Sequence, residues 1–351
     1  MPVLIVLLGI LLFGFLIAIH EFGHFMTAKL SGVKVNEFAI GMGPKLLSKQ
    51  GAETLYTLRL FPIGGFCAME GEDEDSDDPR SFQKAKAWKK FLIMAAGAFM
   101  NFVVGLLIFI VLAAASDSYV APVVAEFLPE YAPSGGPQLQ IGDRILSVDG
   151  HPIFVADDIR LFFQRGGDDL DIVVRRNGER VILKGCHMPP FLTEDGYQQR
   201  GIKLEERPLT FGNILQQGWG DSIDTVRLVW LSLGDLFSGA VGIRDMSGPV
   251  GIVDMMGQVA VSAPSAWDAV YRILYFSAFI AVNLAVMNLL PIPALDGGRI
   301  FFLIVDLLYT AITRRKLDPK YEGVVNAVFF VALLGLMLVV AVSDVLKLFG
   351  R

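Results

Sequence analysis

The chain has 351 residues, of which 53% are hydrophobic and only 19% are charged, and its formal net charge is −6 at pH 7. A soluble globular protein rarely has so apolar a composition. No basic excess is present to meet phosphates, so we exclude nucleic acid as a partner and expect membrane lipid instead.

Four uncharged stretches are long enough to cross about 30 Å of hydrocarbon as helices. We place these helices within residues 1–30, 91–116, 267–298 and 321–349. The first stretch lacks the basic residues and the cleavage pattern of a signal peptide, so we expect it to stay in the protein. The sequence therefore predicts a polytopic α-helical membrane protein with four transmembrane helices.

Lysine and arginine gather between the first and second stretches and again between the third and fourth. Residues 29–90 contain ten of them and the link 299–320 contains five. Because basic loops stay in the cytoplasm, residues 31–90 and 299–320 are predicted to be cytoplasmic, and both termini and residues 117–266 extracytoplasmic. Cys67 and Cys186 then lie on opposite sides, so no disulfide is expected.

Residues 117–206 have the pattern of a small α+β module. Strands are predicted at 123–127 and 144–148, a helix at 155–165, and a hairpin at 171–185 that turns at Asn177–Gly178. The stretch LQIGDRILSVDGHPI (139–153) resembles the core of a PDZ domain, which binds peptides by adding a strand to a sheet edge. Residues 207–266 mix apolar and polar side chains, which favours amphipathic helices on the outer membrane surface.

The sequence HEFGH follows the first uncharged run directly. On a helix, His20 and His24 lie on one face and can bind the same metal ion, and this pattern favours zinc. Glu21 lies beside them and suits a general base that takes a proton from water. Ionisable groups at membrane depth are costly and usually functional. The alternative is two polar residues at a helix end that face the headgroups.

A catalytic zinc site needs a third protein ligand. Asp296 is the first charged residue after the third uncharged run, at the same predicted depth as the histidines. Pro291 and Pro293 prevent a regular helix just before it, and irregular backbone at that depth is tolerated only inside protein or a water-filled cavity. The alternative is a helix stop followed by an Asp–Gly turn. His151 and His187 lie in the extracytoplasmic module and are expected to be ordinary surface or turn histidines.

HEFGH, the segment NLLPIPALDG (288–297) and the PDZ-like module between them together resemble the site-2 proteases, and in particular their bacterial regulator-of-sigma-E branch. The resemblance implies an intramembrane zinc metalloendopeptidase with His20, His24 and Asp296 as zinc ligands and Glu21 as catalytic base. It also implies that the segments 39–46 and 60–67 form a membrane re-entrant β-loop, and that 247–252 matches an extracytoplasmic segment of the family. Substrate-binding roles are implied for Asn283, Asn288, Pro291, Pro293, Gly64 and Gly65.

The same resemblance implies a setting in the bacterial inner membrane, with the active site near the cytoplasmic face. The implied substrates are single-pass transmembrane proteins, such as a pre-cleaved anti-sigma factor or remnant signal peptides. They would be cut in regulated intramembrane proteolysis, envelope stress signalling or signal-peptide clearance, after an upstream site-1-type protease has acted. Members of this branch often carry two PDZ modules, whereas this chain has one.

Two other classes of function stay open on the residues alone. A transporter could use intramembrane histidine and aspartate as a translocation site, which inverted repeats would support, and none is seen. A catalytically inactive scaffold could present the PDZ-like module, and the absence of Glu21 or of a third ligand would have favoured it. Both residues are present.

Overall fold

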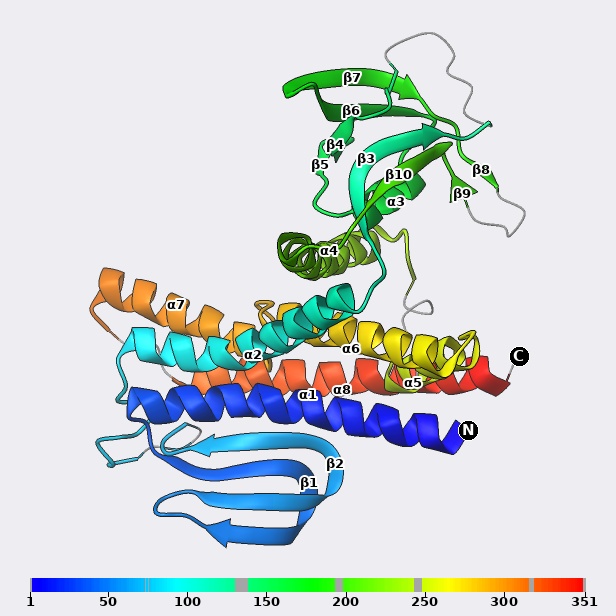
Figure 1. The fold of residues 1–351 in the computed structure, drawn as a ribbon. Helices are drawn as coiled ribbons and strands as arrows, with labels where there is room; N and C mark the ends of the chain where they lie inside the picture. The colour runs from blue at the N-terminus through cyan, green and yellow to red at the C-terminus, as the bar shows by residue number, and fades with distance from the viewer. Residues whose placement is uncertain are drawn as a thin grey trace. The chain divides into compact units, whose positions relative to one another are not determined.

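The structure is a computed structural model that describes residues 2–72, 74, 76–129, 138–192, 198–242, 248–315 and 319–349. The chain forms two compact units (Figure 1). One unit, the helical unit, combines Met1–Leu106 with Val226–Arg351, and the other, the inserted unit, is Leu107–Thr225. The inserted unit contains residues 117–206, for which the sequence predicted a separate α+β module, and extends beyond them at both ends.

Four helices of the described chain are long and apolar enough to cross a membrane. They lie in α1 (Pro2–Ser31), α2 (Ala87–Ala114), α6 (Ala266–Asn288) and α8 (Pro319–Phe349). These helices confirm the prediction of a polytopic membrane protein. Two more helices of this unit are α5 (Pro249–Val261) and the end of α4 (Phe211–Ser238), where the sequence predicted amphipathic helices.

The third predicted span is shorter than expected. Helix α6 ends at Asn288, and residues 289–295 are not helical, because Pro291 and Pro293 cannot continue the hydrogen-bond ladder. A separate helix, α7 (Asp296–Thr313), then fills most of the predicted cytoplasmic link. The irregular backbone predicted at Pro291 and Pro293 is present, the helix placed within 267–298 ends before that range does, and a helix in 299–320 was missed.

The segment between α1 and α2 is a sheet made of two long, bent strands, β1 (Val35–Gln50) and β2 (Leu55–Met69). Residues 35–40 pair with 65–69 on one side and with 55–58 on the other, and residues 45–50 pair back onto 55–59. The sheet lies against α1 (Figure 1). The approach is close, since a Cβ added at Gly14 would lie 2.3 Å from the carbonyl oxygen of Pro62.

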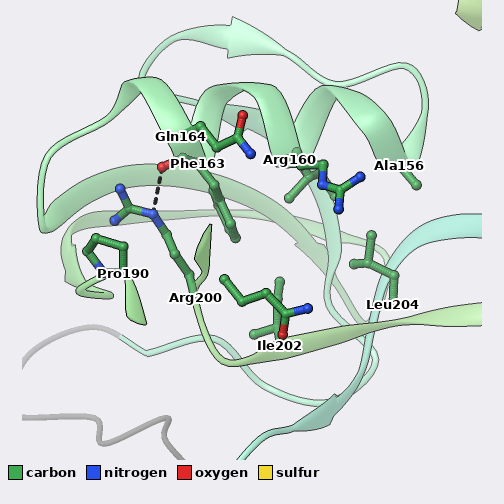
Figure 2. Close-up of a pocket in the computed structure, with 10 residues that line it drawn as sticks. Ala156, Arg160, Phe163, Gln164, Pro190, Arg200, Ile202 and Leu204 are labelled. Atoms are coloured by element: carbon green, nitrogen blue, oxygen red, sulfur yellow. Dashed lines mark hydrogen bonds between the residues drawn. The ribbon is translucent and has the colours of Figure 1, made fainter. Parts of the chain in front are cut away.

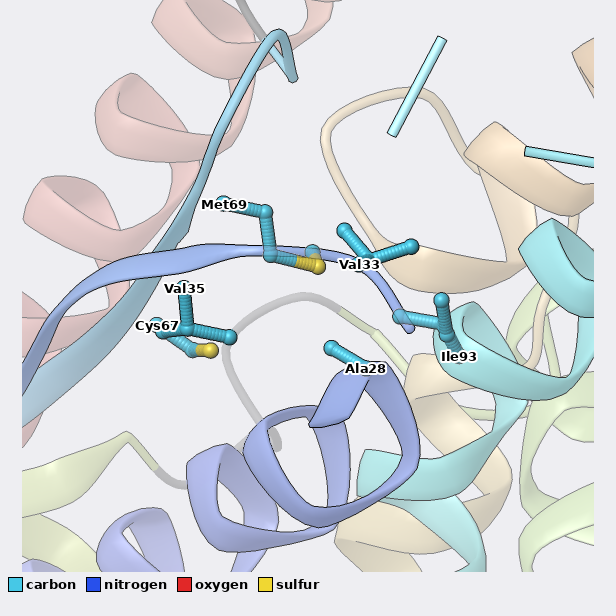
Figure 3. Packing of buried hydrophobic residues seen from close by; sticks show 6 residues of the cluster. All are labelled: Ala28, Val33, Val35, Cys67, Met69 and Ile93. Atoms are coloured by element: carbon cyan, nitrogen blue, oxygen red, sulfur yellow. The ribbon is translucent and has the colours of Figure 1, made fainter. Parts of the chain in front are cut away.

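A small apolar core joins this sheet to α1 and α2. It contains the buried side chains of Ala28, Val33, Val35, Cys67, Met69 and Ile93 (Figure 3). Phe25 and Phe38 pack against it from the side. Burying a side chain of valine or isoleucine size stabilises a fold by about 1.5–3 kcal/mol, so this core fixes the position of β2 relative to the end of α1.

Helix α5 is anchored to α8 by one carboxylate. Asp344 is buried, and its Oδ2 accepts hydrogen bonds from the backbone N–H groups of Gly248 and Gly251, each 2.9 Å long. These donors belong to the first turn of α5, which has no capping side chain of its own. The 247–252 motif therefore has a structural role here, except for residue 247, which lies outside the described residues.

The inserted unit is built around a mixed helix and sheet fold with strand order β10–β3–β4–β6–β7, with β5 paired to β4. The strands are β3 (Tyr119–Phe127), β4 (Arg144–Val148), β5 (His151–Pro152), β6 (Asp169–Arg176), β7 (Glu179–His187) and β10 (Ile202–Arg207), with a short pair β8 (Phe191–Leu192) and β9 (Gln198–Gln199). Helix α3 (Ala156–Arg165) follows β5, and the start of α4 closes the unit.

The predicted elements of this unit are confirmed, with small shifts at their ends. The 144–148 strand and the helix match closely, and the hairpin turns at Asn177–Gly178, both with positive φ. Strand β3 begins four residues earlier than predicted, and β10, its antiparallel partner, was missed. Cys67 and Cys186 are free, as expected.

The position of Asp296 depends on close backbone packing within the segment 289–297. A Cβ added at Gly297 would lie 2.2 Å from the carbonyl oxygen of Leu290. We expect Gly297→Ala to destabilise the protein by about 1–3 kcal/mol, as overpacking does, and to displace the neighbouring Asp296. The measurements are the thermal midpoint and the metal content of the purified protein.

Gly335→Ala on α8 is the matched control, because a Cβ there meets nothing within 4 Å and alanine favours a helix by about 0.5–1 kcal/mol. Equal behaviour of the two variants would contradict the importance of the 289–297 segment.

Candidate metal centre

Helix α1 brings two histidines to one point. His20 and His24 are one turn apart, and their Nε2 atoms lie 3.1 Å from each other. The Nδ1 atom of His24 lies 2.8 Å from the carbonyl oxygen of Ile93 on α2, which can only accept a hydrogen bond. The neutral tautomer of His24 therefore has its proton on Nδ1 and a free lone pair on Nε2.

Asp296, the first residue of α7, completes a group of three. Its Oδ2 lies 3.1 Å from Nε2 of His20 and 3.3 Å from Nε2 of His24. The three residues offer ligand atoms that all lie within 4.8 Å of one another. The structure thus brings together the two histidines and the aspartate that the sequence suggested, from positions far apart in the chain.

The geometry of this group fits zinc. Asp296 Oδ2 is buried and has no hydrogen-bond partner, although two ring nitrogens lie within 3.3 Å of it. Oδ2 therefore does not act as a hydrogen-bond acceptor for either ring nitrogen. At zinc distances of about 2.0–2.2 Å, tetrahedral ligand atoms lie about 3.3 Å apart. Two imidazoles and a carboxylate leave a fourth position for water, as in catalytic zinc sites.

Two glycines let the helices approach closely enough to build the site. A Cβ added at Gly97 of α2 would lie 2.4 Å from Nε2 of His24 and 2.7 Å from Nε2 of His20. A Cβ added at Gly23 of α1 would lie 2.4 Å from the carbonyl oxygen of Ala96. Neither Gly97 nor Gly23 could therefore be replaced by a larger residue without moving the two helices apart.

Glu21 faces the sheet. A Cβ added at Gly65 of β2 would lie 3.4 Å from Cγ of Glu21 and 3.8 Å from Ile17. Gly64, the preceding residue, has a φ of +91° and packs against Met42 of β1. The strand that carries both predicted glycines therefore passes directly beside the predicted catalytic base.

The other predicted site residues lie on the segment around Asp296. The side chain of Asn288 lies 3.5 Å from Nδ1 of His20. Asn283 is five residues earlier on α6, about 7.5 Å along the helix axis. Pro291 and Pro293 lie in the non-helical segment, where Pro293 packs closely on Gly298.

The two remaining histidines have the ordinary roles that the sequence predicted. His151 stacks on Phe162, and His187 pairs with Asp169 at 2.7 Å. Both residues belong to the inserted unit.

Sequence reasoning missed three contributors to the centre. The carbonyl of Ile93 carries no side-chain signal. Gly97 belongs to the GAFMN segment, whose small residues could have indicated a close helix contact. Glu72 forms an ion pair with Arg299, which ties the start of α7 to the loop after β2. Neither Glu72 nor Arg299 belongs to a recognisable motif.

The inserted unit has a pocket of about 150 Å³ between α3 and β10 (Figure 2). Its lining includes the apolar side chains of Ile159, Phe163 and Leu204 and the charged side chain of Arg160. Arg200 is almost fully buried, and its guanidinium donates to four backbone carbonyls, those of Phe163, Gly166, Gly167 and Met188. In the described sheet, β10 is an edge strand.

Comparison with known proteins gives a consistent result. The model of "Peptidase family M50" matches residues 8–336. The chain belongs to peptidase family M50.

Relatives of this M50 chain match it over nearly their full length. A protein from Clostridium perfringens named "Putative zinc metalloprotease" is 39% identical over 344 residues, which cover 97% of this chain and 98% of the relative. A protein of the same description from Clostridium acetobutylicum is 36% identical, with 97% of each chain covered. The zinc metalloprotease RasP of Geobacillus kaustophilus is 27% identical, again with 97% of each chain covered.

The family assignment confirms the predicted resemblance to site-2 proteases at the level of the family. The protein is a metalloprotease and its metal is zinc. Neither the transporter nor the inactive-scaffold hypothesis accounts for this combination of family, near-complete coverage and a zinc-shaped group of ligand atoms.

We expect His24→Ala and Asp296→Ala to lower the zinc content of the purified protein well below one ion per chain, because each removes one of three converging ligand atoms. Asp306→Ala is the matched control, since Asp306 lies on the same helix about 15 Å further along its axis. Zinc is measured by atomic absorption after gel filtration in detergent. Stoichiometric zinc in the Asp296 variant would remove that residue from the ligand set.

Proposed function

We propose that this protein is an intramembrane endopeptidase in which His20, His24 and Asp296 bind zinc and Glu21 is the general base. The observation that carries this proposal is the convergence of three ligand atoms, two from α1 and one from α7, at a helix whose residues Gly9–Ser31 are long and apolar enough to span a membrane. Ionisable groups in such a helix are costly and therefore indicate function.

The proposed chemistry follows from the positions of the side chains. Zinc at this site would polarise a peptide carbonyl and lower the pKa of a water molecule toward about 7. Glu21 accepts the proton of the attacking water at its carboxylate and delivers it to the departing amide nitrogen, which must be protonated to leave. Ile93 fixes the ring of His24 through its carbonyl, so that Nε2 stays directed at the centre.

A transmembrane substrate must be unwound before it can be cut, because every backbone group of a helix is already bonded. The β1–β2 sheet offers a way to hold it. Among the described pairings, residues 65–69 of β2 have a partner on one side only, and Gly65 lies beside Glu21. An extended substrate strand added to this edge would have its backbone next to the catalytic base.

The exposed side chains of the sheet support its proposed role as a re-entrant loop. Large apolar residues face outward there, namely Ile40, Met42, Leu46, Leu47, Leu58, Leu60 and Phe61. Such a surface is unfavourable in water. The contact of Pro62 with Gly14 also lies about 25 Å along α1 from Ser31, so the sheet reaches the depth of the spanning helix.

The 288–297 segment is proposed to hold the unwound substrate on the other side. The resemblance to site-2 proteases assigns Asn283, Asn288, Pro291 and Pro293 to substrate binding. The non-helical stretch 289–295 supports this proposal, because its two prolines interrupt the helical hydrogen-bond ladder directly before Asp296.

The inserted unit is proposed to be a PDZ domain that selects substrates. Its pocket lies between α3 and the edge strand β10, which is the arrangement that strand addition of a peptide requires. The domain would admit single-pass proteins already shortened by a site-1-type protease, such as an anti-sigma factor or a remnant signal peptide. The basic residues of 29–90 and 299–320 favour an orientation with these loops in the cytoplasm and the PDZ domain outside a bacterial inner membrane.

Glu21→Gln separates this enzyme from an inactive scaffold. The amide keeps the size of the side chain but cannot accept the proton of water, so cleavage of a single-pass test protein should fall about 10²–10⁴-fold while zinc stays bound. The test protein carries helix-breaking residues in its membrane segment, and cleavage is followed by gel electrophoresis in reconstituted vesicles.

Glu53→Gln is the control, because Glu53 pairs with Lys29 at the end of the same helix and should leave cleavage unchanged. A second control substrate with a polyleucine segment should resist the parent enzyme, since its helix is harder to unwind. Parent-like cleavage by the zinc-loaded Glu21 variant would show that the proposed mechanism is wrong.

A further inference from the structure

The two histidines of the centre differ in what supports their outer ring nitrogens. An imidazole that binds metal through Nε2 carries its proton on Nδ1, and this N–H needs an acceptor that fixes the ring. For His24 the acceptor is the carbonyl oxygen of Ile93 at 2.8 Å, a backbone group. For His20, the contact at Nδ1 is the side-chain amide of Asn288 at 3.5 Å.

As placed, the amide nitrogen of Asn288 faces Nδ1 of His20. Two N–H donors would then oppose each other once His20 is bound to a metal through Nε2. The oxygen and nitrogen of an amide are assigned from their hydrogen bonds, and turning the group by 180° places Oδ1 against the Nδ1 proton. The turned amide gives His20 the support that Ile93 gives His24.

We propose that Asn288 is a positioning residue for the metal centre, whose side-chain oxygen accepts the Nδ1 proton of His20 and so orients that ligand toward zinc. This role goes beyond contact with substrate. The amide NH2 group remains a donor, so Asn288 can bind a substrate carbonyl at the same time. The inference rests on the proposed ligation of zinc by His20.

The surroundings of Asn288 support such a role. It is the last residue of α6, and this helix is packed against α1 through the buried side chains of Leu16, Ile280 and Ala281. The residues that follow it, Leu289 and Leu290, provide the backbone against which Gly297 packs, next to Asp296. The segment 288–297 therefore positions both the ligand Asp296 and Asn288, the residue proposed to orient His20.

The test is the zinc affinity of the full-length protein in detergent, measured by competition with a chelator and without substrate. Asn288→Ala should weaken zinc binding about 10–100-fold, as loss of a ligand's support typically does. Asn288→Asp keeps an acceptor for the Nδ1 proton and should bind zinc at least tenfold more tightly than Asn288→Ala. Arg272→Ala, about 24 Å further back along the same helix, should match the parent.

Cobalt(II) provides a second readout, because its visible spectrum reports the geometry of the ligands. The spectrum should change in Asn288→Ala and return toward that of the parent in Asn288→Asp. Parent-like zinc affinity in Asn288→Ala, or equal affinities of the Ala and Asp variants, would overturn the inference and leave Asn288 a substrate-binding role alone.

His20→Ala distinguishes the two levels of the proposal. Loss of zinc in His20→Ala together with parent-like affinity in Asn288→Ala defeats only the positioning role. Tight zinc binding in His20→Ala defeats the ligand assignment itself.

Discussion

Three ligand atoms from two helices, two imidazole nitrogens and one carboxylate oxygen, meet at one point, and the rest of the helical unit is organised so that they can. Nε2 of His20, Nε2 of His24 and Oδ2 of Asp296 lie about as far apart as ligands on one zinc ion, and Oδ2 has no hydrogen-bond partner. Without a cation such a group is costly to bury. Zinc binding is therefore expected to contribute to the stability of the fold as well as to catalysis.

Two kinds of backbone contact make this convergence possible. Gly97 allows α2 to lie directly on the imidazoles, and the packing of Gly297 on Leu290 holds the start of α7 beside them. The same logic extends to the substrate side, where Gly65 brings β2 to Glu21. At each of these three positions a glycine, which has no side chain, lets another part of the protein come close. The site is therefore assembled by close packing of main chains around a few polar groups.

Local patterns predicted most of what the sequence could predict, whereas the grouping of Asp296 with the two histidines drew on its predicted membrane depth and on the resemblance to site-2 proteases. Uncharged runs identify the spans, Asn177–Gly178 identifies the hairpin, and the spacing of His20 and His24 identifies the helix face. Strand β10 was missed because its partner β3 lies about 75 residues earlier, and α7 was missed because the segment was judged by its basic residues. The support of His24 by Ile93 has no sequence signal, since every residue has a carbonyl.

The central claim is that two imidazoles and one carboxylate of this chain hold the zinc. X-ray absorption spectroscopy at the zinc edge, on the zinc-loaded full-length protein in detergent, tests it most directly. We expect only nitrogen and oxygen donors at about 2.0–2.2 Å, with the outer-shell scattering of two imidazole rings. A sulfur donor near 2.3 Å, or scattering that requires no imidazole, would contradict it.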